Sequence, residues 1–113
     1  MKKKYYHQKL IRDKIPEKIK EAEGDYKARI LGGVEFEKEL KKKLVEESKE
    51  LAKAPKGELL NELADVLELV KSLASNYKIP FSKVEKFQEE KRKKRGAFKK
   101  KLFLVWSTGK TGK

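Results

Sequence analysis

Four acidic residues are spaced so that they could bind one metal ion together: Glu47 and Glu50, then Glu62 and Asp65. Within each pair the carboxylates are three residues apart, which in a helix places them on one face, one turn from each other. The segment between the pairs includes A-P-K-G at residues 54–57, which has the chemistry of a turn. Two helices joined by a short turn fold back antiparallel, so we expect the two pairs to face each other.

The apolar residues around the acids predict that these carboxylates face a core. In the helix expected at residues 34–54, Glu47 falls in the middle of the apolar stripe, and Glu50 lies about 60° to one side. In the helix expected at residues 58–77, the second pair lies on the shoulder of the main stripe. The predicted stripes are Phe36, Leu40, Leu44, Leu51 and Ala54, then Leu59, Leu63, Val66, Val70, Ala74 and Tyr77, with the second acidic pair in line with Leu69 and Leu73.

Converging carboxylates repel one another, and each is costly near a core unless a cation pairs with it. A divalent cation removes this repulsion, and hard oxygen ligands suit Mg²⁺, with Mn²⁺ as an alternative. The other interpretation is an acidic shoulder exposed to solvent and neutralised by the many lysines. The position of Glu47 inside an apolar stripe favours the metal site.

The pattern E-E-x-x-E at residues 46–50, followed by E-x-x-D at 62–65, resembles the MazG-like all-α nucleoside triphosphate pyrophosphohydrolase superfamily. That superfamily includes dimeric dUTPases and the phosphoribosyl-ATP pyrophosphohydrolase-like branch. K-L-I-R-D-K-I-P-E at residues 9–17 is similar to the opening of one branch, and K-x-x-x-R-G-x-F at 91–98 is similar to the end of a family helix. The sequence departs from that last pattern at Ala97, where the family has a second glycine.

The resemblance implies a Mg²⁺-dependent enzyme that cleaves a nucleoside triphosphate between the α and β phosphates, giving monophosphate and pyrophosphate, with a role in cleaning the nucleotide pool. Phosphoribosyl-ATP is the alternative substrate. The residues it implies are Glu47, Glu50, Glu62 and Asp65 as Mg²⁺ ligands, Glu46, Glu47 and Glu50 as catalytic carboxylates, and Lys91, Arg95 and Arg12 as phosphate-binding cations.

Two of these assignments have open alternatives. Lys91 and Arg95 extend the face of Val84 and Phe87, so we expect them to point towards the body of the protein, but a solvated basic helix end has the same composition. Arg12 has the alternative of a structural salt bridge with a neighbouring acid.

The remaining pattern predicts an all-α fold: an antiparallel helical hairpin or bundle of about four helices with one or two short peripheral strands. A first helix starts near Pro16 with Asp13 as its cap and ends at Gly24. A last helix starts at a capping box on Ser82 and ends at Gly96. The predicted strands are residues 26–31 and 102–106, with an extended arm as the alternative for 102–106. Residues 1–106 are expected to form a single domain, and residues 107–113 a flexible tail.

Composition narrows the class of protein. The chain has 113 residues and no cysteine, which excludes disulfides, thiolate metal sites and thiol catalysis. No apolar run approaches the roughly 18 residues of a membrane span, so we expect a cytoplasmic protein with no membrane partner. A chain this short buries a modest core, so we expect a homodimer or a higher homo-oligomer. Abundant Lys and Glu with only four Asn and Gln are typical of a thermophilic source.

The net charge of +13 fits a polyanionic partner, either a nucleoside triphosphate or a nucleic acid. A basic helical nucleic-acid-binding protein is therefore the main alternative function. Acidic pairs on facing helices would repel a nucleic-acid backbone, so nucleic acid is not the expected partner. A third alternative is a helical oligomerisation module without chemistry, which would not bind Mg²⁺.

Overall fold

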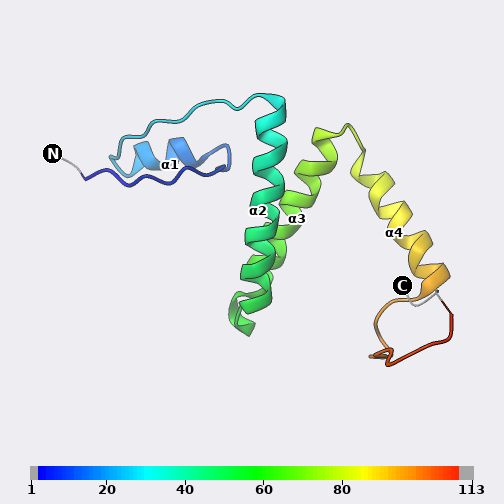
Figure 1. The fold of residues 1–113 in the computed structure, drawn as a ribbon. Helices are drawn as coiled ribbons and strands as arrows, with labels where there is room; N and C mark the ends of the chain where they lie inside the picture. The colour runs from blue at the N-terminus through cyan, green and yellow to red at the C-terminus, as the bar shows by residue number, and fades with distance from the viewer. Residues whose placement is uncertain (1–2, 110–113) are drawn as a thin grey trace. The chain divides into compact units, whose positions relative to one another are not determined.

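The computed structural model describes residues 3–109, and this part of the chain is helical without any strand (Figure 1). The all-α prediction is confirmed. No helix of the described residues is both long and apolar enough to cross a membrane. The chain divides into two compact units, Met1–Ile79 and Pro80–Lys113. The elements are α1 (Ile15–Glu21), α2 (Gly33–Lys53), the 3-10 turn η1 (Lys56–Glu58), α3 (Leu59–Asn76) and α4 (Phe81–Arg95).

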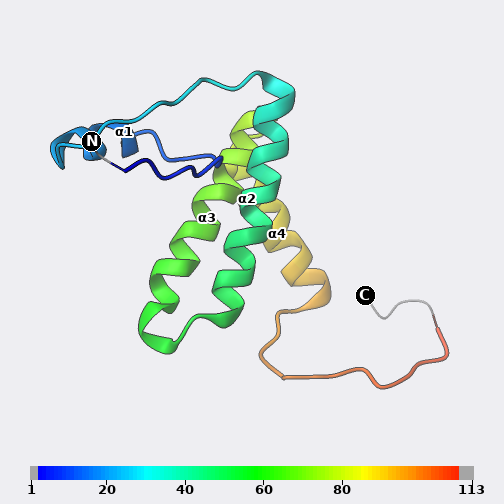
Figure 2. The ribbon, with the colours of Figure 1, turned by 60° about the vertical axis from the view of Figure 1, so that its left-hand side comes forward.

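The helices α2 and α3 form the predicted antiparallel hairpin and lie side by side in both views (Figures 1 and 2). The amide of Ala54 donates to the Leu51 carbonyl at 3.2 Å, which closes the last turn of α2. Pro55 is extended and cannot continue the helix. The amide of Glu58 then donates to the Pro55 carbonyl at 2.9 Å, and α3 begins at the next residue. This short connection forces the chain to reverse.

The core of the hairpin is small. In the described residues the buried side chains are Leu40 of α2, at 2% exposed, and Leu69 and Ala74 of α3. The predicted stripe on α2 is confirmed, because its other members, Phe36, Leu44, Leu51 and Ala54, are half-buried around Leu40.

The predicted stripe on α3 is partly wrong. Three of its members, Leu59, Leu63 and Tyr77, are exposed. Of its other members, Ala74 is buried and Val66 and Val70 are half-buried, and the shoulder that continues from the acidic pair to Leu69 and Leu73 packs beside them. α3 is therefore rotated about its axis from the predicted orientation, and this rotation carries its two carboxylates towards α2.

A polar cluster joins α2 to the carboxyl end of α3. The Tyr77 hydroxyl donates to the carboxylate of Glu37, and Lys41 Nζ donates to the same carboxylate at 3.0 Å. The Lys41 ammonium also lies 5.7 Å from the centre of the Tyr77 ring. The Tyr77 hydrogen bond, followed by the one from Lys41, lowers the pKa of Glu37. These contacts hold the ends of the hairpin together.

The helix α1 begins at Ile15, one residue before Pro16, so Pro16 lies in the first turn of the helix, close to the predicted start. The expected cap is wrong: Lys14 occupies the N-cap without a side-chain hydrogen bond, and the Arg12 carbonyl accepts from the amide of Ile15 at 3.1 Å instead. After the helix, the Gly24 amide donates to the Ile19 carbonyl at 2.8 Å. A Cβ at Gly24 would lie 2.9 Å from the Ile19 side chain, so this close return of the chain requires glycine.

Both strand predictions are wrong. Residues 26–31 and 102–106 are irregular, and neither segment forms a backbone ladder in the described part of the chain. Ile30 is 99% exposed and Phe103 is 89% exposed. Alternating or apolar residues favour extended backbone, but a strand exists only where a second strand accepts its hydrogen bonds.

The helix α4 begins one residue before the predicted start, with Pro80 as N-cap and no side-chain cap. The capping box at Ser82 is therefore wrong, because Ser82 already lies inside the first turn. Gly96, with φ of 82°, ends the helix as expected. Of the predicted tail at 107–113, residues 110–113 lie outside the described residues.

Candidate metal centre

Three of the four predicted ligands converge in the hairpin. Glu47 of α2 and Glu62 and Asp65 of α3 each offer a carboxylate oxygen, and these oxygens all lie within 4.8 Å of one another. All three residues are half-buried. Glu47 reaches the site because it follows the α2 stripe, and the α3 residues reach it because that helix is rotated onto its acidic shoulder. The packing of two helices therefore concentrates negative charge in one place.

Within this cluster, Glu62 is the carboxylate whose ionised form is disfavoured by its surroundings. Burial raises its pKa, and the charges of Asp65, Glu47, Glu50 and Glu58, in decreasing order, raise it further. Its Oε2 atom is buried and accepts no hydrogen bond within the described residues. A buried carboxylate oxygen without a hydrogen-bond donor costs free energy, so binding of a cation or a proton at this atom is favourable.

Arg12 provides a positive charge at the centre. Its guanidinium donates to Asp65 Oδ1 at 2.8 Å, with the two side chains 57% and 31% exposed. The salt-bridge alternative for Arg12 is therefore confirmed, while its contact with phosphate stays a prediction. Because Arg12 and Asp65 are 53 residues apart, the ion pair also ties the segment before α1 to the hairpin.

The donor set fits a hard divalent cation. The ligands are all carboxylate oxygens, which suit Mg²⁺ or Mn²⁺ and exclude a thiolate-type site. With all three carboxylates ionised, the guanidinium of Arg12 offsets one of the three negative charges. A divalent cation would balance the remaining two. The orphaned Glu62 Oε2 is a ready ligand atom.

Glu50 and Glu46 lie outside the converged set. Glu50 is exposed, as expected for a residue to one side of the apolar stripe, but its charge still raises the pKa of Glu62. Glu46 is also exposed, and its side chain lines a neighbouring pocket. Tight packing therefore gathers three of the predicted carboxylates, while these two remain in water at the rim.

Lys91 and Arg95 belong to the other unit, and both are exposed on α4. The Lys91 ammonium lies 5.1 Å from the centre of the Phe87 ring, one turn earlier on the same helix. Phe87 is itself 60% exposed, so this cation–π contact lies in solvent, which matches the alternative of a solvated basic helix end. Their role in phosphate binding stays a prediction.

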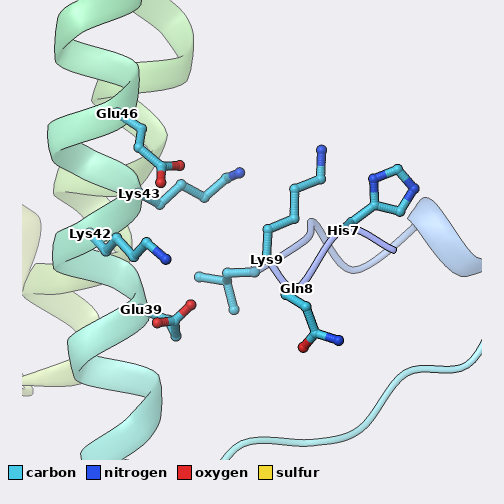
Figure 3. Close-up of a pocket in the computed structure, with 8 residues that line it drawn as sticks. His7, Gln8, Lys9, Glu39, Lys42, Lys43 and Glu46 are labelled. Atoms are coloured by element: carbon cyan, nitrogen blue, oxygen red, sulfur yellow. The ribbon is translucent and has the colours of Figure 1, made fainter. Parts of the chain in front are cut away.

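The structure also contains a pocket that the sequence reasoning missed. It has a volume of about 190 Å³ and lies between the N-terminal segment and α2 (Figure 3). One signal in the sequence points to it: Glu39, Lys43 and Glu46 share one helix face, four and three residues apart. The lining residues are His7, Gln8, Lys9, Leu10, Glu39, Lys42, Lys43 and Glu46.

Comparison of this chain with families of known proteins, with curated proteins and with solved structures found no match. The function is therefore inferred from the residues themselves and from the geometry of the hairpin.

Proposed function

We propose that this protein is a Mg²⁺-dependent nucleotide pyrophosphohydrolase that cleaves a nucleoside triphosphate between the α and β phosphates. The observation that carries the proposal is the convergence of Glu47, Glu62 and Asp65 within 4.8 Å. These residues belong to the E-E-x-x-E and E-x-x-D segments that resemble the MazG-like superfamily. Three of the four carboxylates that the sequence pattern selects as ligands are thus the ones that converge. Phosphoribosyl-ATP is the alternative substrate.

In this proposal Glu47, Glu62 and Asp65 hold the cation, and Glu50 completes the set by a rotamer change at the exposed rim. Bound Mg²⁺ would neutralise phosphate charge and polarise the phosphoryl oxygen. A carboxylate ligand must be ionised, so a bound cation would offset the burial and neighbouring charges that raise the pKa of Glu62. The cation would then be the partner of Glu62 Oε2, which accepts no hydrogen bond within the described residues.

The chemical step is attack of water on the α-phosphorus. Glu46, beside the centre in sequence, or one of the cation-binding carboxylates orients the water and accepts its proton. The new bond joins the water oxygen to the α-phosphorus, the α–β bridging bond breaks, and pyrophosphate leaves with the bridging oxygen. By the resemblance of their helix end, Lys91 and Arg95 are proposed to bind phosphate.

A screen of ordinary and damaged nucleoside triphosphates with Mg²⁺ or Mn²⁺ tests the function by measuring nucleoside monophosphate and pyrophosphate. Glu47→Gln and Asp65→Asn should each lower the rate by more than about a hundredfold, since even outer partners of metal ligands contribute roughly 10–100-fold. Glu68→Gln is the matched control, because Glu68 is an exposed acid on α3 outside the cluster. Full activity in both site variants would remove the assignment.

We also propose that the active form is a homodimer or a higher homo-oligomer. Leu60 is 81% exposed, Leu63 49% and Leu67 46%, which leaves an apolar strip along α3 outside the hairpin core. A second copy of the hairpin would cover this strip and complete a four-helix bundle. Light scattering of the full chain, compared with Leu63→Lys, measures this directly: a wild-type monomer at all concentrations contradicts it.

One observation favours a second function, binding of nucleic acid by the Pro80–Lys113 unit. Its described part, residues 80–109, contains ten Lys and Arg against three Glu, and every one of these cations is exposed. Exposed cations bind nucleic-acid phosphates without a preformed geometry. Binding of duplex or single-stranded DNA that weakens steeply with salt, in a protein that hydrolyses no nucleotide, would select this function.

A further inference from the structure

The pocket between the N-terminal segment and α2 presents several cations to one small space. Lys42 and Lys43 extend from α2 towards the N-terminal segment, where Lys9 stands between them and His7 in the view of Figure 3. Lys43 is half-buried, so its aliphatic part is held against the protein while its ammonium group reaches the pocket. The pocket is therefore a preformed group of cations contributed by two distant segments of the chain.

These cations are available to a ligand. The ion pairs of the described residues engage Arg12, Lys20, Arg29 and Lys41, and none of them uses a lysine of the pocket. Two carboxylates, Glu39 and Glu46, also line the space, so three lysines leave an excess of one positive charge.

The volume restricts the class of ligand. Pockets that enclose a whole drug-sized molecule span roughly 300–1,000 Å³. A pocket of about 190 Å³ is too small for a nucleotide and suits one anionic group at the end of a larger ligand. Ammonium groups bind phosphate oxygens through charge-assisted hydrogen bonds.

The pocket adjoins the candidate metal centre along α2. Glu46 lines the pocket, and its neighbour Glu47 belongs to the acidic cluster. Lys43 lies one helical turn before Glu47 on the same face. The N-terminal segment makes a second connection, because residues 7–10 line the pocket and Arg12 bonds to Asp65. One extended ligand could therefore contact both places.

We infer that this pocket is a phosphate-binding subsite in which Lys9, Lys42 and Lys43 hold a phosphate or pyrophosphate group while the adjacent carboxylates hold the cation. The inference rests on the proposed function for its assignment of that group to a nucleoside triphosphate. Lys43 is the central residue, because it joins the pocket to the helix face of the acidic cluster. The carboxylates of Glu39 and Glu46 limit the affinity for a bare anion and favour a phosphate that arrives with Mg²⁺.

Calorimetric titration with inorganic pyrophosphate, in buffer containing a chelator and again with Mg²⁺, tests the subsite on the full chain. Lys43→Gln and Lys9→Gln should each weaken binding about tenfold in both buffers, the loss typical of one charge-assisted hydrogen bond. Lys49→Gln is the matched control, since Lys49 is an exposed lysine of α2 outside the pocket. Circular dichroism of each variant confirms that the helices are intact.

Affinities within about twofold of wild type for both pocket variants would overturn the subsite, since exposed lysines with no ligand contribute that little. The proposed function fails separately. Glu62→Gln should lose Mg²⁺ binding and turnover but keep lysine-dependent pyrophosphate binding in chelator. If no nucleotide is hydrolysed and Lys43→Gln still weakens pyrophosphate binding, the subsite stands and the enzymatic proposal falls.

Discussion

The α2–α3 hairpin and the Pro80–Lys113 unit both hold side chains of like charge at helical spacing, but only the hairpin brings them together. In α3 the acids Glu62 and Asp65 are three residues apart, and in α4 the cations Lys91 and Arg95 are four apart. The hairpin adds a second helix, which supplies Glu47 to the same point. In α4 the cations are exposed to water.

This difference has a clear electrostatic consequence. Carboxylates held close together and half-buried are poorly screened, and the raised pKa of Glu62 records the cost. Exposed charges on α4 are screened by salt over about 8–10 Å and need no partner. Residues 80–113 carry 12 Lys and Arg against three Glu, whereas residues 1–79 carry 19 Lys and Arg against 15 Asp and Glu. Most of the net positive charge of the chain therefore lies in the unit whose described cations are exposed to water. Packing, more than helical spacing, turns like charges into a binding site.

The largest effect should come from removing the core that forces the acids together. Leu40→Ala should lower the free energy of unfolding by about 2–5 kcal/mol, because Leu40 is 2% exposed and its loss leaves a cavity. Leu104→Ala, in the other unit, should change it by less than about 0.5 kcal/mol, because Leu104 is 60% exposed. Urea denaturation followed by circular dichroism measures both. Equal decreases in the free energy of unfolding for the two variants would show that the hairpin and the Pro80–Lys113 unit are packed alike.

A smaller effect should come from relieving the carboxylate repulsion. Glu62 has a raised pKa, so its ionisation opposes folding: the metal-free protein should lose stability as the pH rises from the ordinary value of Glu62, about 4.3, through the raised value. Glu62→Gln removes this loss. At neutral pH it should raise the melting temperature of the metal-free protein by a few degrees and abolish stabilisation by Mg²⁺.

Glu89→Gln on α4 is the control for that experiment, because Glu89 is exposed and lies outside the acidic cluster. It should change neither the pH dependence nor the response to Mg²⁺. Glu37 has a lowered pKa and works in the opposite sense, adding stability that is lost as the pH falls. Melting curves from pH 4 to pH 8 with and without Glu62→Gln therefore isolate the contribution of Glu62. If that difference is flat across the range, the repulsion is absent.

The smallest effect should come from Arg12, whose guanidinium balances Asp65 across a partly exposed ion pair. Arg12→Gln removes a cation that competes with Mg²⁺, so the affinity for Mg²⁺ should rise by up to about fivefold, the equivalent of a surface ion pair. Calorimetry with Mg²⁺ alone measures this, with Arg29→Gln as the control, since Arg29 pairs with Glu35 instead. A weaker affinity would mean that Arg12 holds Asp65 in a ligand orientation.

The sequence by itself determined the helices and the identity of the acids. Apolar spacing predicted α2 and α3 to within one residue at each end, because burial of a periodic face is a local property of the chain. The turn at 54–57 predicted the antiparallel reversal, and the interruption of the α2 stripe by Glu47 predicted a carboxylate that faces the core.

Only the tertiary structure decided which acids meet. The rotation of α3 depends on how its apolar residues pack against α2, and α3 is apolar on more than one face, so Leu63 could be exposed and Leu69 buried. The partner of Arg12 and the pocket at Lys43 each join segments distant in the chain, which no local pattern specifies. The strand predictions failed for the same reason: an extended segment becomes a strand only when a remote segment supplies its hydrogen bonds.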